Sequence, residues 1–146
     1  MDLILWRHAD AEDAGPGKSD LQRELTGKGR KQAERVAEWL RERLPKDYSV
    51  IASPAARAQQ TAEALGVKFR TDKSIAPGAR VADLLKAAGW PEGKGTVVLV
   101  GHQPDLGHAV AELLAGRASD WSLKKGALVW VALKYDAVRL VASISP

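Results

Sequence analysis

The sequence contains no cysteine, which excludes disulfide scaffolds, zinc ribbons, iron–sulfur clusters and thiol nucleophiles. No apolar run approaches the ~20 residues of a membrane-spanning helix. Met1 leads directly into an apolar strand pattern without the basic segment of a signal peptide. The chain also shows no internal repeat and no low-complexity tract. We therefore expect a cytoplasmic protein with no membrane partner.

What is present has the composition of an ordinary globular domain. Of the 146 residues, 45% are hydrophobic and 27% are charged, which suffices for one packed core. We therefore expect a single domain over residues 1–146. The 22 Lys and Arg outnumber the 18 Asp and Glu to give a net charge of +4, which favours anionic partners. A phosphate group satisfies this charge as well as DNA does.

Strand patterns alternate with helix patterns along the chain. Strands are predicted at residues 3–6, 49–52, 67–70 and 96–100, and a hairpin at 127–133 and 138–143. Helices are predicted from Thr26 to Leu44, from Ser53 and Pro54 to Leu65, at 81–88, and from Pro104 to Gly116. This order indicates an α/β fold of three layers: a mostly parallel central sheet flanked by helices, with the C-terminal hairpin antiparallel at one edge.

Reactive side chains follow three of the predicted strands. Arg7 and His8 come after the first strand, Arg57 after the second, and His102 after the strand at 96–100. Because ligands of parallel sheets bind outside the carboxyl ends of the strands, we expect these side chains to converge on one crevice. Two arginines and two histidines would make it cationic, and planar guanidinium groups suit phosphoryl oxygens.

Each of these residues has a chemical reading and a structural alternative. Arg57 lies in the first turn of its predicted helix, where the helix dipole disfavours a cation by ~0.3–1 kcal/mol unless an anion compensates. A neutral imidazole at His8 is available as a nucleophile on phosphorus, and His102 would donate to developing negative charge. The alternatives are a solvent-exposed arginine and histidines that only hydrogen-bond at loops.

Histidine spacing gives little support to a metal site. His102 and His108 are six residues apart, and the chain has only three histidines, so we expect no bound metal. His108 falls with Asp105 and Glu112 on the polar stripe of its helix, which predicts a solvated or rim position.

Nucleic-acid binding is also disfavoured. The basic residues of the first helix alternate with glutamates, which predicts a salt-bridged exposed face. The five tryptophans show no regular spacing for base stacking and are expected in the core or at interfaces. The basic residues are Arg30, Lys31, Arg35, Arg41 and Arg43, and the glutamates are Glu34, Glu38 and Glu42.

Taken together, the motifs resemble those of the histidine phosphatase superfamily, also called phosphoglycerate mutase-like. The likeness covers nearly the whole chain. The small size, the start Arg7-His8-Ala9-Asp10 and the lack of a long helical insertion between residues 66 and 95 resemble its SixA-type phosphohistidine phosphatase branch. The matching motifs are Leu5-Trp6-Arg7-His8-Ala9, Leu25-Thr26 with Gly29, Ser53-Pro54 with Arg57-Ala58 and Gln60-Thr61, and Val100-Gly101-His102.

The resemblance implies a phosphoglycerate mutase-like fold and a two-step transfer without metal or other cofactor. In that transfer His8 takes the phosphoryl group and water releases it. The resemblance further implies that Arg7, Arg57 and His102 hold the phosphate and that Arg23 is an additional arginine near the pocket. Ala9 stands where the family usually has glycine, which requires this position to avoid positive φ.

The acid that larger family members carry in their insertion has no counterpart in this sequence. Asp10, Asp13, Asp20 and Asp105 are loop carboxylates that could replace it, and nothing in the sequence chooses among them. Phosphohistidine needs little acid assistance, because imidazole leaves as a base whose conjugate acid has a pKa of ~6.5. The missing insertion is also expected to leave the pocket open to a side chain of another protein.

We therefore predict a phosphohistidine phosphatase. Its expected partner is a phosphohistidine-bearing protein, such as a phosphotransfer domain or a carrier protein, and not a nucleic acid. A small-molecule phosphomonoesterase of the same superfamily and a catalytically silent phosphoprotein-binding module are the alternatives. The intact imidazole of His8 argues against the silent module, because binding alone does not need a nucleophile.

Overall fold

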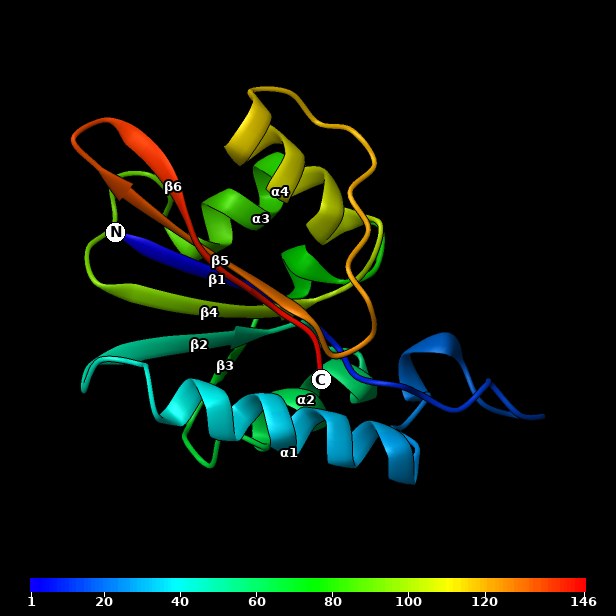
Figure 1. Ribbon diagram of the computed structural model, residues 1–146. Coiled ribbons are helices and arrows are strands. Elements are labelled where there is room, and N and C mark those ends of the chain that lie inside the picture. Colours follow the sequence, from blue (N-terminus) through cyan, green and yellow to red (C-terminus); the bar gives the residue numbers. More distant parts are fainter.

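A computed structural model describes all residues 1–146 (Figure 1). The strands are β1 (Asp2–Arg7), β2 (Tyr48–Ala52), β3 (Arg70–Thr71), β4 (Thr96–Gly101), β5 (Leu128–Lys134) and β6 (Ala137–Ile144). The helices are α1 (Gly27–Arg41), α2 (Ala56–Glu63), α3 (Val81–Ala88) and α4 (Asp105–Ala115), with 3-10 turns η1 (Asp20–Gln22) and η2 (Lys73–Ile75). Every helix falls short of the length and apolar character that a bilayer crossing needs.

The strands form one six-stranded sheet in the order β3-β2-β4-β1-β5-β6. β1, β2, β3 and β4 pair in parallel, whereas β5 runs antiparallel to β1 and β6 antiparallel to β5. Helices α1 and α2 cover one face of the sheet, and α3 and α4 cover the other (Figure 1). The predicted three-layer α/β architecture, with its antiparallel C-terminal hairpin at one edge, is therefore confirmed.

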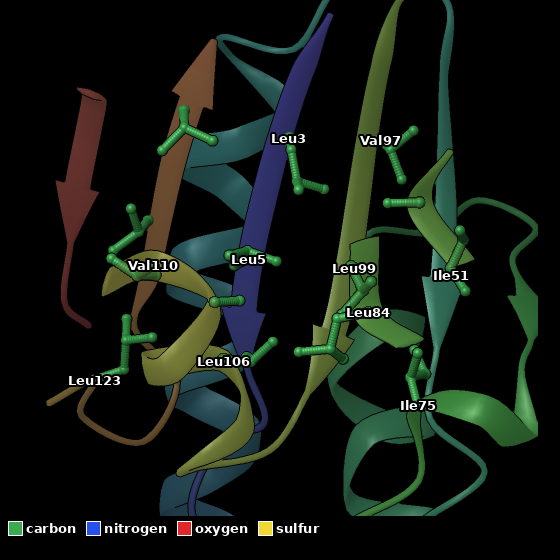
Figure 2. Close-up of a cluster of buried hydrophobic side chains, with 14 of the residues drawn as sticks. Leu3, Leu5, Ile51, Ile75, Leu84, Val97, Leu99, Leu106, Val110 and Leu123 are labelled. Atoms are coloured by element: carbon green, nitrogen blue, oxygen red, sulfur yellow. The ribbon is translucent and has the colours of Figure 1, made fainter. Parts of the chain in front are cut away.

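Alternating side chains of the central strands supply two hydrophobic cores. Leu3 and Leu5 of β1 lie on the side of α3 and α4, where they pack with residues such as Leu99 and Leu106 (Figure 2). Ile4 and Trp6 belong to the second core, beneath α1 and α2. Because helices cover both faces, β4 is buried along its whole length, as is typical of a central parallel strand.

Three elements depart from their predicted ranges by more than one residue. Helix α2 begins at Ala56 with Ala55 at its N-cap, so Ser53 and Pro54 are not its start. The Ser53 hydroxyl instead accepts from the Ala55 N–H and contacts Nε2 of His102. Helix α1 ends at Arg41, after which the Leu40 carbonyl accepts from the N–H groups of both Arg43 and Leu44. The third strand pairs with β2 only over Arg70–Thr71, later than the predicted 67–70.

The exposed face of α1 is not the continuous salt-bridged surface that the sequence predicts. Arg41 pairs with Glu34 over 2.7 Å, and Arg43 pairs with Glu42 over 3.2 Å. Arg41 also donates to the Ala64 carbonyl after α2, which turns it and Glu34 toward that helix. The basic residues at the N-terminal half of α1 are left without an acidic partner; these are Lys28, Arg30, Lys31 and Arg35.

Gly29 is the point at which α1 touches the loop after β1. A Cβ at this position would overlap the carbonyl oxygen of Asp10, whereas a Cβ at Gly27 would meet open space. We expect Gly29→Ala to lower the free energy of unfolding by about 1–3 kcal/mol, because two backbone segments must separate. Gly27→Ala, in the same helix, is the control and is expected to be neutral or stabilising. Urea denaturation of both variants tests this, and equal stabilities would disprove the close contact.

Candidate active site

The register of β1 and β4 places two histidines side by side. Arg7 and Gly101 are partners in the parallel ladder. His8 and His102 therefore emerge together at the carboxyl edge of the sheet, where the His8 N–H donates to the Gly101 carbonyl over 3.0 Å. Their ring centroids are 5.2 Å apart. Both rings are buried, with 7% of His8 and 3% of His102 exposed.

The imidazole of His8 is held as one neutral tautomer. Its Nδ1 lies 2.8 Å from the Ala9 carbonyl oxygen, and a carbonyl only accepts, so Nδ1 carries the proton. Its Nε2 lies 3.3 Å from Nε of Arg57, and a guanidinium only donates. Nε2 therefore keeps its lone pair, which is the electron pair that a nucleophilic imidazole uses.

The surroundings keep both histidines uncharged at neutral pH. Burial lowers the pKa of His8 to about 4, and the charges of Arg57 and Arg7 act in the same direction, opposed only by the Ala9 carbonyl. Burial likewise lowers the pKa of His102 to about 3, and His8 and Arg57 add to the shift. Since a histidine in water has a pKa of ~6.5, both rings are free bases across the physiological range.

Arg57 is the second residue of α2 and is 4% exposed. Beyond its contact with His8, it donates from Nη1 to the Asp20 carbonyl over 2.7 Å and from Nη2 to the Asp20 carboxylate over 3.0 Å. An anionic group does therefore compensate this cation near the helix N-terminus, as the sequence predicts, and in this state the anion is a carboxylate of the chain itself.

The predicted Arg23 joins the site through Asp20. Its Nη1 donates to the Asp20 carboxylate over 3.1 Å, and its Nε donates to the Glu12 carbonyl over 2.7 Å. The hydrogen bond from Arg23, with help from Arg57, lowers the pKa of the Asp20 carboxyl. Asp20 is therefore ionised at neutral pH and bridges two arginines.

Two buried groups at the site have no hydrogen-bond partner in the chain. Arg7 donates from Nη1 to the Leu123 carbonyl over 2.8 Å, but its Nε is unpaired. His102 contacts the Ser53 hydroxyl through Nε2 over 2.7 Å, and its Nδ1 is unpaired. When the Ser53 hydroxyl donates to Nε2, the His102 proton sits on Nδ1. With the proton there, Arg7 Nε and His102 Nδ1 are both buried donors without an acceptor in the chain.

Two hydroxyl groups hold this arrangement, those of Ser53 and Thr61, and the sequence predicts a role in the site for neither. Thr61 Oγ1 accepts from the Ala9 N–H and donates to the Arg57 carbonyl, so it ties the end of β1 to α2. Ser53 aligns His102 instead of capping α2. The sequence spacing could have indicated that Thr61 lies near Arg57, because it follows Arg57 by four residues and so lies one turn later on the same helix face.

Of the four carboxylates that the sequence left open as acids, only Asp20 contacts a predicted site residue. Asp10 binds the Thr26 hydroxyl over 2.7 Å and the Lys125 ammonium over 3.1 Å. Asp13 is exposed and makes no side-chain hydrogen bond. No protonated carboxyl contacts His8 or His102.

Asp105 corrects a prediction. Its helix stripe was expected to face solvent, but Asp105 is buried because its carboxylate accepts from the backbone N–H groups of Gly78 and Ala79 over 2.9 and 3.1 Å. Burial raises the pKa of this carboxyl. Asp105 therefore fastens the loop before α3 onto the N-terminus of α4. His108 is partly exposed and contacts Asp120, as a rim residue would.

The site is expected to be open to a partner, but the side chains of His8, Arg57 and His102 are buried in this structure. Residues 66–95 do lack a long helical insertion, since they hold only β3, η2 and the eight-residue α3. However, none of the three hollows in the surface is lined by His8, Arg57 or His102. The loop that carries Asp20 and Arg23 lies over Arg57 instead. No three acidic or histidine side chains are grouped closely enough to hold a metal ion.

The part of the chain that contains most of these site residues matches the model of a known protein family. The model of the histidine phosphatase superfamily (branch 1) matches residues 3–80, which contain Arg7, His8, Arg23 and Arg57. The chain belongs to the histidine phosphatase superfamily. It is a phosphatase, a hydrolase with a catalytic histidine, and the resemblance found in its sequence is confirmed.

Relatives place this histidine phosphatase near the SixA type. It is 31% identical to phosphohistidine phosphatase SixA of Escherichia coli over 125 residues, covering 80% of this chain and 76% of that protein. An uncharacterised protein of Picosynechococcus sp. is 34% identical over 152 residues, covering 97% of this chain and 90% of that protein. The structure of the protein histidine phosphatase SixA complexed with tungstate superposes with a TM-score of 0.83 at 27% identity, covering 100% of this chain and 97% of that one.

The lowered pKa of His8 predicts how the ring titrates. We expect His8 to remain the neutral Nδ1–H tautomer down to pH 5 and to protonate near pH 4, because burial and two arginines disfavour the imidazolium ion. Nitrogen NMR chemical shifts of the ring across pH 3.5–8 measure this, with His8→Asn to assign the signals. A midpoint near 6.5 would show a solvated histidine.

The contact between Asp20 and Arg57 predicts competition with bound anions. We expect Asp20→Asn to tighten tungstate binding up to ~5-fold, since an ion pair with one exposed partner contributes up to ~1 kcal/mol. Asp13→Asn removes the same charge from the same loop without touching Arg57 and is the matched control. Calorimetric titration compares them, and weaker binding to Asp20→Asn would make Asp20 a support of the anion site instead.

Proposed function

We propose that this enzyme removes the phosphoryl group from a phosphorylated histidine on a partner protein through a phospho-His8 intermediate. The observation that carries the proposal is the neutral Nε2 of His8, unprotonated and facing the Arg57 guanidinium in a buried site. It is supported by the similarity to SixA proteins, which are called phosphohistidine phosphatases or protein histidine phosphatases.

In the first step, Nε2 of His8 attacks phosphorus and the phosphorus–nitrogen bond of the substrate breaks. The substrate imidazole, which enters with a proton on its other ring nitrogen, takes the bonding electron pair and leaves as a neutral base, while His8 keeps its own proton on Nδ1. Arg57, the Arg7 Nε and the His102 Nδ1 stabilise the charge on the phosphoryl oxygens, once Asp20 has been displaced from Arg57. In the second step, the oxygen of a water molecule bonds to phosphorus and the phosphorus–Nε2 bond breaks with its electron pair returning to His8. Both protons of the water leave with the product as dihydrogen phosphate.

The absence of an acid at the site favours phosphohistidine over a sugar phosphate. Both histidines are neutral, Asp20 is ionised, and Asp105, whose pKa is raised, faces the loop before α3. An alkoxide leaves poorly without a proton, and a general acid typically contributes ~10²–10⁴-fold to the rate. Imidazole leaves as a neutral base and needs no such help.

The test compares kcat/KM for three substrates under one set of conditions. A phosphorylated phosphotransfer domain should exceed a sugar phosphate by ~100-fold or more, with an aryl phosphate between them. Rapid acid-free quenching should trap a phosphoenzyme, and His8→Ala should lose it while still binding tungstate through the arginines. Preference for the sugar phosphate would establish a small-molecule phosphomonoesterase. Binding of the phosphoprotein without turnover would establish a silent binding module.

A further inference from the structure

The N-terminal half of α1 carries a stripe of basic side chains that form no salt bridge within the chain. Lys28, Lys31 and Arg35 are exposed and follow one another at helical spacings of three and four residues. None of them forms a salt bridge. With Gln32 and Pro146 they line a surface groove of about 410 Å³, called here the basic groove.

The basic groove adjoins the segment that follows His8. Gln32, in the wall of the groove, accepts from the Asp10 N–H over 2.9 Å. The Asp10 carboxylate in turn pairs with Lys125, and the next residue, Gly126, donates from its N–H to the His8 carbonyl over 3.0 Å. The start of α1 and the segment before β5 lie at the same end of the sheet as the ends of β1 and β4 (Figure 1).

We infer that the basic groove is the docking surface for acidic side chains that surround the phosphohistidine of a partner protein. This inference rests on the proposed function, which requires a macromolecule to approach His8 across this end of the sheet. Lysines and arginines without a salt-bridge partner attract carboxylates over several ångströms and raise the rate of encounter. The groove has no aromatic lining on which nucleobases would stack, which separates it from a single-strand nucleic-acid channel.

The basic side chains of the groove make no contact that the fold needs, so they are available to bind a partner. Lys28, Lys31 and Arg35 pack against no core cluster, and their side chains make no hydrogen bond within the protein. Gln32 differs from them, because its contact with Asp10 fixes the loop after β1. A charge reversal that spares Gln32 therefore changes the field of the groove without removing a contact of the fold.

The test uses peptides of one length that carry a single histidine, phosphorylated with phosphoramidate and flanked by either glutamates or glutamines. The wild type should turn over the glutamate-flanked peptide with a kcat/KM at least 10-fold higher at low ionic strength, and the advantage should vanish at high salt. The variant Lys28→Glu, Lys31→Glu, Arg35→Glu should lose or invert this preference. Its turnover of an aryl phosphate should equal that of the wild type.

A matched control separates the groove from net charge. Lys46, Lys94 and Lys134 lie at the opposite end of the sheet, before β2, before β4 and at the end of β5, and form no salt bridge. Reversing these three to glutamate makes the same change in total charge and should preserve the peptide preference. An equal loss in both triple variants would overturn the docking surface in favour of a general charge effect.

Other outcomes are equally decisive. Equal kcat/KM for the two peptides in the wild type would refute the docking surface while leaving the proposed function intact. Failure of the wild type on every phosphohistidine peptide, with aryl phosphate turnover retained, would refute the proposed function. A third outcome would assign the groove to nucleic acid. In that case the wild type binds duplex DNA at physiological salt, and the groove variant alone loses this binding while its peptide turnover is unchanged.

Discussion

The parallel pairing of β1 with β4 is the constraint on which the site depends. Once Arg7 stands opposite Gly101, His8 and His102 must leave the sheet as neighbours, and β2 on the other side of β4 brings Ser53 to the same edge. The two cores hold this register, because a slip by one residue would exchange Leu3 and Leu5 with Ile4 and Trp6. Catalytic geometry is therefore fixed by hydrophobic packing on both faces of the sheet.

Local patterns predicted most of this architecture. Strand runs, the Thr26 cap and the glycine after α4 appear in the structure where the sequence places them, because each is set by neighbours in the chain. The convergence of Arg57 with the two histidines was predictable as well, since strand ends of one sheet must meet. The predicted start of α2 was wrong because a tertiary contact intervenes. The Ser53 hydroxyl contacts His102 across the sheet, and Ala55 is the N-cap of the helix.

The polar contacts between distant loops could not be predicted. Nothing near Asp20 in the sequence indicates that its carboxylate meets Arg57, 37 residues away. Asp105 looks like a surface residue in its helical pattern, and only the approach of the Gly78 loop buries it. The glutamates of α1 are spaced to pair with several cations, yet Glu34 turns toward Arg41 because α2 lies on that side. Such choices depend on packing between elements.

In the proposed function, the contact between Asp20 and Arg57 makes substrate binding an exchange of one anion for another. A phosphoryl group that enters displaces a carboxylate already bound to the same guanidinium, so the number of neutralised charges at Arg57 changes little. Binding at such a site responds weakly to ionic strength, in contrast to binding at an uncompensated cationic surface. Free phosphate that binds at Arg57 would meet the same competition from the enzyme's own carboxylate.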